Sequence, residues 1–351
     1  MFQPPFPAPR QITVAAVQPA LTLGTVGENL TRLDRLIRDA VSRHRPDVVM
    51  VPESATTPNV YARVLRTTVQ PVDGAPMQLL RDLARELGVV VGGGFVARRG
   101  DHARGTFVLA EHDGAAHLHD KDIPTMWENN YYAGGNGPGL TTLGTLGEVP
   151  VGIASGWEWA RMGTARRLRG RVGILLGGMC WPSYPLNWRG PFGALACREH
   201  ALQRQAAREL PRQVARLIGA PVVHASHVGP ISFATPLAPG VSWRTEMLGE
   251  TQIVERDGTI VARLTTEDGE GHVAATVNLA APEPSDPLAP TYWIPPFSVT
   301  TRAAWRAMNT HGAVKYRALR ATGRHPWQGL PDRDLPDEIA PGASLDQTLL
   351  P

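Results

Sequence analysis

The sequence predicts an α/β fold, and three observations lead to that class. Short β-branched runs such as residues 12–17 and 149–155 have the length and composition of buried strands. Apolar residues at helical spacing follow many of these runs, as they do between residues 30 and 41. The run over residues 47–53 is almost wholly apolar, which is typical of a strand that is covered on both faces.

In the first half of the chain, each predicted strand is followed by a helix or by a second strand. After the first strand, Thr25 and Glu28 form a capping-box pattern that begins a helix, and Pro46 ends it. A second helix, which follows the next strand, is closed by Gly88. This second helix spans residues 79–87. The remaining elements predicted here are strand 89–96 and hairpin strands 106–111 and 115–119 about Asp113-Gly114.

The second half continues this alternation up to residue 279. Its predicted elements are strand 149–155, helix 159–169, strand 172–176, helix 194–217 with a kink expected at Pro211, and strands 222–226, 251–255, 260–264 and 272–279. Asp257-Gly258 predicts the turn between two of the last strands. The alternation of strands and helices is thus sustained along most of the chain.

Composition divides the chain into three parts. Residues 1–10 contain several prolines and predict a flexible lead-in, whereas residues 11–281 form the α/β domain. Residues 282–351 begin with a proline-rich connection and continue into a basic, alanine-rich helical stretch. The chain is therefore expected to hold one large domain and a C-terminal extension.

The extension carries aromatic residues that predict a contact. Its helical stretch over residues 302–320 is expected to break at Gly312. Trp305 and Tyr316 within it need burial, so we expect the extension to pack across a homodimer or a larger homo-oligomer.

The composition is that of a globular protein, with 42% hydrophobic and 19% charged residues. A net charge of +3 without a clustered basic motif argues against a nucleic-acid partner. No run approaches the roughly 18 apolar residues of a membrane helix, and prolines stand where a signal peptide needs an apolar run.

Cys180 and Cys197 lack metal-ligand spacing and predict reduced thiols in the cytoplasm. His119, His224 and His227 form no ligand motif either, so no metal or cofactor is expected.

Three predicted strand ends carry residues suited to chemistry. Glu53 follows a buried strand and is either a solvated carboxylate or a general base at the ligand-binding edge of a sheet. Lys121 lies among aspartates and is either part of a solvated salt bridge or a cation that stabilises an oxyanion, with Glu128 holding it. Gly156 ends a β-branched run, either because a tight turn needs glycine or because the turn is a nucleophile elbow.

In this order and spacing, the three segments resemble the nitrilase superfamily of carbon–nitrogen hydrolases. The matching motifs are Val51-Pro52-Glu53, Lys121-Asp122-Ile123-Pro124 with Trp127-Glu128, and Gly152-Ile-Ala-Ser-Gly-Trp-Glu158. The resemblance covers residues 11–281 and implies a four-layer αββα sandwich that forms homo-oligomers and uses no metal. It also implies that Glu53 is the family's base, Lys121 its lysine and Glu128 its second glutamate, and it places the family's nucleophilic cysteine on Gly156.

Glycine at this position removes the thiolate that would attack an amide or nitrile carbon. Trp157 and Glu158 normally follow the cysteine directly and therefore fix the register of the motif. A shift to Ser155 would lose this match, and it is expected to turn the side chain to the other face of the strand. Thiol-dependent hydrolysis is therefore not expected of this chain.

Four interpretations remain, for a substrate class of small amides, nitriles, carbamoyl or acyl compounds. The chain is a divergent enzyme in which Glu53 activates water, a pseudoenzyme that binds a ligand or a protein, an engineered cysteine knockout, or an enzyme with its thiol at Cys180. Cys180 is expected at the same edge of the sheet as Gly156. A role as small buried packing residues is nevertheless the simpler explanation for both Cys180 and Cys197. The retained Glu-Lys-Glu set favours an enzymatic role. The aromatic candidates for lining a substrate pocket, together with Cys180, are Trp157, Trp181, Tyr184 and Trp188.

Overall fold

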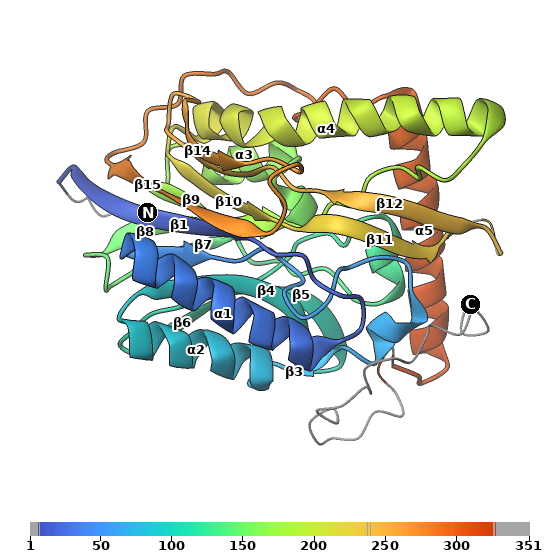
Figure 1. The fold of residues 1–351 in the computed structure, drawn as a ribbon, viewed down its shortest axis with the longest axis horizontal. Coiled ribbons are helices and arrows are strands. Elements are labelled where there is room, and N and C mark those ends of the chain that lie inside the picture. The colour runs from blue at the N-terminus through green and yellow to red at the C-terminus, as the bar shows by residue number, and fades with distance from the viewer. Residues whose placement is uncertain (1–5, 7, 237, 239, 326, 328–351) are drawn as a thin grey trace.

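Two β-sheets pack face to face, and helices cover both outer faces (Figure 1). The computed structural model describes residues 6, 8–236, 238, 240–325 and 327; the predicted lead-in lies mostly outside this range, as does the last stretch of the C-terminal extension. Helices α1 (Val26–His44) and α2 (Ala75–Leu87) cover one sheet. Helices α3 (Met162–Leu168) and α4 (Gly190–Ile218) cover the other. These layers confirm the expected αββα sandwich.

The first sheet has the strand order β15-β1-β2-β4-β5-β6, with β3 paired to β4. Its strands are β1 (Arg10–Gln18), β2 (Val48–Met50), β3 (Gln70–Pro71), β4 (Val90–Arg99), β5 (His102–Ala110), β6 (Ala116–Asp120) and β15 (Gly271–Leu279). The β1, β2 and β4 strands run parallel, and β5 and β6 form the antiparallel hairpin expected from the sequence. The carboxyl ends of β1, β2 and β4 therefore meet at one edge of the sheet.

The second sheet has the strand order β14-β13-β10-β9-β8-β7. Its strands are β7 (Leu140–Leu143), β8 (Val149–Ser155), β9 (Ile174–Met179), β10 (Val222–Ser226), β13 (Thr251–Val254) and β14 (Ile260–Leu264). At its centre, β8, β9 and β10 run parallel. A separate ribbon consists of β11 (Val228–Ala234) and β12 (Ser242–Leu248).

Apolar strand residues fill the space between the sheets. Val48 and Met50 of β2 face Val151, Ile174 and their neighbours in one buried cluster. A second cluster lies between the first sheet and the apolar faces of α1 and α2. Because both faces of the central strands are covered, their sequences are apolar throughout rather than alternating.

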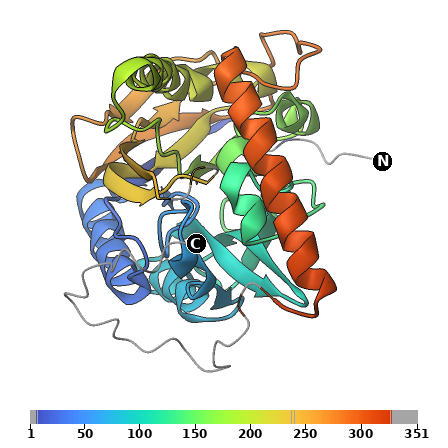
Figure 2. The same cartoon turned by 90° about the vertical axis from the view of Figure 1, so that its right-hand side faces the viewer.

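Helix α5 (Val299–Ala321) crosses one side of the molecule (Figure 2) and packs on the 3₁₀ turn η2 (Met126–Asn130) of the same chain. The helix continues through Gly312, so the expected break is wrong. A β-carbon at this position would press against Asn129, which explains a glycine here as a point of close approach. Tyr316 is buried within its own chain and contacts His102, so its burial does not require a second subunit. The homo-oligomer stays a prediction.

Two other local expectations are corrected. Thr25 does precede α1, but its hydroxyl makes no capping hydrogen bond, so the capping box does not form. Cys197, expected to be a packing residue, is exposed on α4. Within the described residues, no helix is long and apolar enough to span a membrane.

Candidate functional site

Glu53, Lys121 and Glu128 come together at the strand ends as a buried ionic cluster. Glu53 follows β2, Lys121 follows β6, and Glu128 lies in η2. The Lys121 Nζ atom lies 3.0 Å from Glu53 Oε2 and 2.9 Å from Glu128 Oε1. No member of the cluster is more than 4% exposed, so the solvated alternatives for Glu53 and Lys121 are wrong.

Burial and charge set the protonation of this cluster. Burial alone would lower the pKa of Lys121, but Glu128 and Glu53 together raise it to about 12. Burial raises the pKa of Glu128 above its usual range, although Lys121 opposes this effect. The lysine is therefore charged, and it holds the two carboxylates together.

Gly156 begins the short 3₁₀ turn η3 (Gly156–Glu158) directly after β8. Its φ of 56° lies in the left-handed region, which favours glycine. A β-carbon built on this residue would overlap the carboxylate of Glu53 and the ammonium of Lys121. The charged ends of these two side chains therefore occupy the space that any side chain at position 156 would need.

Ser155 also faces this cluster, which corrects the expectation that its side chain points away. Its hydroxyl donates a hydrogen bond of 3.2 Å to Glu53 Oε2. Strand alternation does not separate residues 155 and 156, because the chain leaves β8 and enters η3 between them. The backbone nitrogen of Ser155 donates to Glu158 Oε2 at 2.9 Å, which fixes the turn.

The Glu158 side chain stabilises the η3 turn through hydrogen bonds and ion pairs. It lies 2.8 Å from His119 Nε2 and 3.2 Å from Arg167 Nη2, and it is fully buried. Burial would raise the pKa of Glu158, but His119 and the arginines Arg161 and Arg167 hold it far below its usual range. The carboxylate is thus ionised, and it also accepts a hydrogen bond from the backbone of Asp122, next to Lys121.

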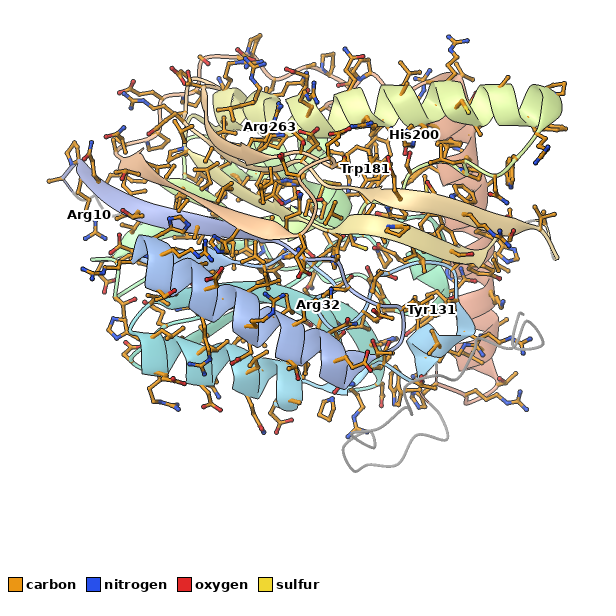
Figure 3. All side chains as sticks on the ribbon, viewed as in Figure 1. Arg10, Arg32, Tyr131, Trp181, His200 and Arg263 are labelled. Carbon is orange, nitrogen blue, oxygen red and sulfur yellow. The ribbon has the colours of Figure 1, made fainter. Side chains whose placement is uncertain are left out.

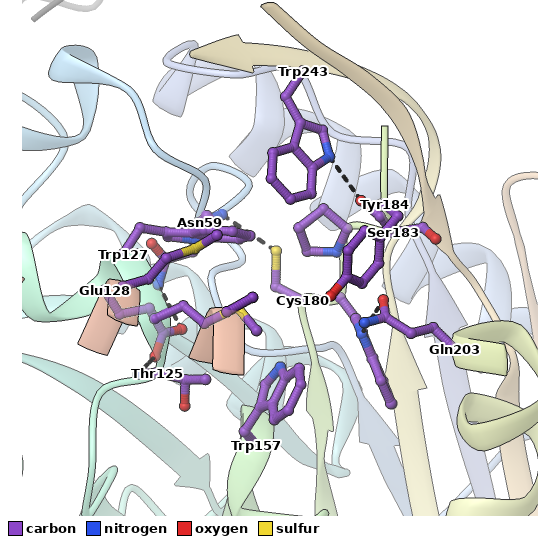
Figure 4. Close-up of a pocket in the computed structure, with 15 residues that line it drawn as sticks. Asn59, Thr125, Trp127, Glu128, Trp157, Cys180, Ser183, Tyr184, Gln203 and Trp243 are labelled. Carbon is purple, nitrogen blue, oxygen red and sulfur yellow. Dashed lines mark hydrogen bonds between the residues drawn. The ribbon is translucent and has the colours of Figure 1, made fainter. Parts of the chain in front are cut away.

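A cavity of about 30 Å³ adjoins the cluster on the side of Glu128 (Figure 4). Such a volume holds a water molecule or the head of a small ligand. Its lining comprises Asn59, Thr125, Met126, Trp127, Glu128, Trp157, Cys180, Trp181, Pro182, Ser183, Tyr184, Gln203, Trp243, Ala304 and Met308. Of the predicted pocket residues, Trp157, Cys180, Trp181 and Tyr184 line it. Trp188 does not and instead packs edge-on against Trp243. Trp181 lies beneath α4, where its indole donates to Gln203 (Figure 3).

Cys180 follows β9 and lies where the sequence placed it, at the edge next to Gly156. Its backbone nitrogen donates to Glu53 Oε1 at 3.0 Å, and its sulfur accepts from the backbone nitrogen of Asn59 at 3.2 Å. Burial raises the pKa of the Cys180 thiol well above its usual range, and Glu53 adds to the effect. A protonated thiol is a poor nucleophile. Its raised pKa therefore argues against the interpretation in which Cys180 serves as the nucleophile.

Asn59 belongs to the site and was not predicted. It lies in the loop between β2 and the 3₁₀ turn η1 (Arg63–Arg66), and its Nδ2 donates to Glu128 Oε1 at 3.0 Å. No motif or periodicity distinguishes this residue in the sequence. Only the path of the loop across the strand ends brings it to the cavity.

His224 and His227 are buried side chains next to the site. His227 donates from Nε2 to the backbone oxygen of Glu53 at 2.6 Å, and His224 packs edge-on against Trp159. Burial lowers the pKa of both histidines to about 4. Among the described residues, no group of three His, Cys, Asp or Glu side chains is arranged to hold a metal ion.

These two histidines predict acid sensitivity. The unfolded chain binds protons below about pH 6.5, whereas the folded histidines resist protonation until about pH 4. The unfolding free energy should therefore fall as the pH drops through this window. Urea unfolding across the window measures it, and His227→Gln should flatten the dependence, whereas the same change at the exposed His112 should not. If the unfolding free energy depended on pH with the same slope in both variants, His227 would not be a source of the acid sensitivity.

The fold and the cluster define a class: αββα sandwich proteins with a buried carboxylate–lysine–carboxylate cluster at the ends of their central strands. A family model described as carbon-nitrogen hydrolase matches residues 13–283. The chain therefore belongs to the carbon–nitrogen hydrolase family.

Solved structures show the same fold at low identity. XC1258 from Xanthomonas campestris, a CN-hydrolase superfamily protein with an arsenic adduct in its active site, is 16% identical with a TM-score of 0.58, over 85% of this chain and 96% of its own. Nit3 from Saccharomyces cerevisiae, of branch 10 of the nitrilase superfamily, is 19% identical with a TM-score of 0.54, over 76% and 90%. A mutant amidase from Nesterenkonia sp. AN1, with acrylamide added at its active-site cysteine, is 15% identical with a TM-score of 0.56, over 75% and 92%. No curated protein matches this chain.

Proposed function

We propose that this chain is a nitrilase-superfamily protein that acts on a small amide, nitrile, carbamoyl or acyl compound without a catalytic thiol. In this proposal Glu53, Lys121 and Glu128 are the retained catalytic set, and Gly156 stands where relatives carry their cysteine. The observation that carries the proposal is the filled space at position 156, which the charged ends of Glu53 and Lys121 occupy. Thiol-dependent hydrolysis lacks its nucleophile, and a side chain at position 156 would require the charged ends of Glu53 and Lys121 to move aside.

The cluster retains groups that can act on a carbonyl compound. The Glu53 carboxylate can take a proton from a water molecule that attacks the carbonyl carbon, and it can later return that proton to the leaving group. The Lys121 ammonium can stabilise the negative charge that develops on oxygen. Glu128 positions Lys121 through the contact of 2.9 Å.

A second candidate is a binding role without catalysis, and the hydrogen bonds of Glu53 favour it. Its Oε1 accepts from the Cys180 backbone, and its Oε2 accepts from Lys121 and Ser155. The described lining of the cavity includes Glu128 but not Glu53. Catalysis therefore requires Glu53 to exchange one of these partners for water, whereas ligand binding does not.

A mass-monitored screen of small amides, nitriles and N-carbamoyl compounds tests the proposal with the unaltered chain and three variants. We expect the unaltered chain to form no acyl-enzyme and to show slow turnover that Glu53→Gln abolishes. Gly156→Cys should gain an acyl-enzyme adduct, because it restores the nucleophile beside its base, and Gly156→Ala is the matched control without the thiol.

Other outcomes separate the two candidates. Turnover that persists in Glu53→Gln would refute the role of this carboxylate. Folded protein without turnover in the unaltered chain, and without an adduct in Gly156→Cys, would favour the binding role.

A further inference from the structure

The cavity contains a buried acceptor that lacks a partner. Asn59 is only 4% exposed, and its Oδ1 makes no hydrogen bond with any described residue. In this orientation Nδ2 donates to Glu128 Oε1 at 3.0 Å and to the Tyr132 hydroxyl oxygen at 3.4 Å, which leaves Oδ1 as the amide atom without a partner. A buried acceptor without a hydrogen-bond donor lowers the stability of the folded protein. A donor group of a ligand in the adjoining cavity would remove this cost at Asn59 Oδ1.

The cluster next to Asn59 also carries an excess of negative charge. Two carboxylates share one ammonium, and Lys121 is the only basic side chain that pairs with Glu53 or Glu128 among the described residues. A buried charge without a counter-charge is costly, so this side of the cavity favours a cation or a proton. The proton is the alternative that burial promotes, because it raises the pKa of Glu128.

Aromatic side chains surround the rest of the cavity. Trp127, Trp157 and Trp243 lie on different sides of the Cys180 thiol in Figure 4. The electron-rich faces of aromatic rings attract cations, and desolvation strengthens this attraction. The aromatic residues of the lining are Trp127, Trp157, Trp181, Tyr184 and Trp243.

We propose that this cavity selects ligands whose pocket-bound part is a cationic N–H donor of the amidinium or ammonium type. One N–H group donates to Asn59 Oδ1, and the positive charge faces Glu128. This inference rests on the proposed small-ligand function and narrows its substrate class to compounds that also carry a positively charged nitrogen. A carboxylate would meet Glu128 as a like charge, and a nitrile would offer Asn59 no donor.

Four probes of nearly equal size test the inference on the unaltered chain: acetamidinium, acetamide, acetonitrile and acetate. Binding is followed through the indole N–H signals of the cavity tryptophans in a titration by nuclear magnetic resonance. We expect acetamidinium to bind roughly tenfold or more tightly than acetamide, because a hydrogen bond to a charged group is the stronger one. Acetonitrile and acetate should bind more weakly still.

Two variants locate the selectivity. Asn59→Leu removes the acceptor and should reduce the preference for acetamidinium over acetamide by roughly tenfold. His112→Gln changes an exposed residue outside the cavity lining and should leave that preference unchanged. The probe series on the unaltered chain keeps the inference testable if Asn59→Leu does not fold.

The outcomes distinguish this inference from the proposed function. If acetonitrile or acetate binds as tightly as acetamidinium, the cation selectivity is wrong while small-ligand binding stands. If none of the four probes binds, both proposals fail for this cavity. Equal preference in Asn59→Leu and the unaltered chain would refute the role of Asn59.

Discussion

Replacing Lys121 with methionine is expected to lower the free energy of unfolding by about 3–5 kcal/mol at neutral pH. The change removes the ammonium between Glu53 and Glu128 and leaves two buried carboxylates facing each other. The loss relative to the unaltered chain should shrink at mildly acidic pH, because protonation of a carboxylate with a raised pKa relieves the repulsion. Urea unfolding at both pH values measures the difference.

The matched control removes a charge of opposite sign. Glu128→Gln leaves Lys121 paired with Glu53, although its amide NH₂ would face one of the donors that Glu128 now accepts from. We therefore expect a smaller loss of stability than for Lys121→Met. If Lys121→Met proved as stable as the unaltered chain, the ionic cluster would not contribute to the fold as its burial indicates.

Gly156→Ala is expected to lower the free energy of unfolding by about 2–4 kcal/mol. The backbone at this position has a φ of 56°, which is unfavourable for any residue with a β-carbon. The added methyl group would also displace the charged ends of Glu53 and Lys121 from each other. Thermal and urea unfolding of the variant measure both effects together.

Gly163 in α3 supplies the control for this substitution. It has ordinary helical backbone, and nothing lies within 4 Å of a β-carbon built there. Gly163→Ala should therefore be neutral or stabilising by about 0.5–1 kcal/mol. A Gly156→Ala variant of unchanged stability would show that the pair moves aside freely and that the site has room for a nucleophile.

Most of the fold could be predicted because hydrophobic periodicity and turn residues indicate each strand, helix and turn from the local sequence alone. Strands 149–155, 222–226 and 260–264 have the predicted bounds. The ribbon of β11 and β12 was not predicted. These strands form a two-stranded sheet of their own, and their pattern is partly polar, so no apolar run marks them. Periodicity also could not show that Gly312 lies against Asn129 inside a continuous helix.

The residues of the candidate site likewise fall into those that the sequence could locate and those that it could not. Glu53, Lys121 and Glu128 could be located because they stand in sequence motifs at strand ends, and the structure brings them together. Ser155 and Asn59 depend on geometry that no local pattern encodes. Ser155 reaches Glu53 because the chain turns directly after β8, and Asn59 reaches the cavity through a loop.

The boundary of the family domain does not coincide with the boundary of the cavity. The family match ends at residue 283, yet Ala304 and Met308 of α5 line the cavity. A gene that kept the ancestral domain but exchanged this last helix would retain the ionic cluster while it acquired a different wall. Under the proposed function, the ligand choice and the acid–base chemistry would therefore be encoded in separate segments of the chain and could diverge separately in evolution.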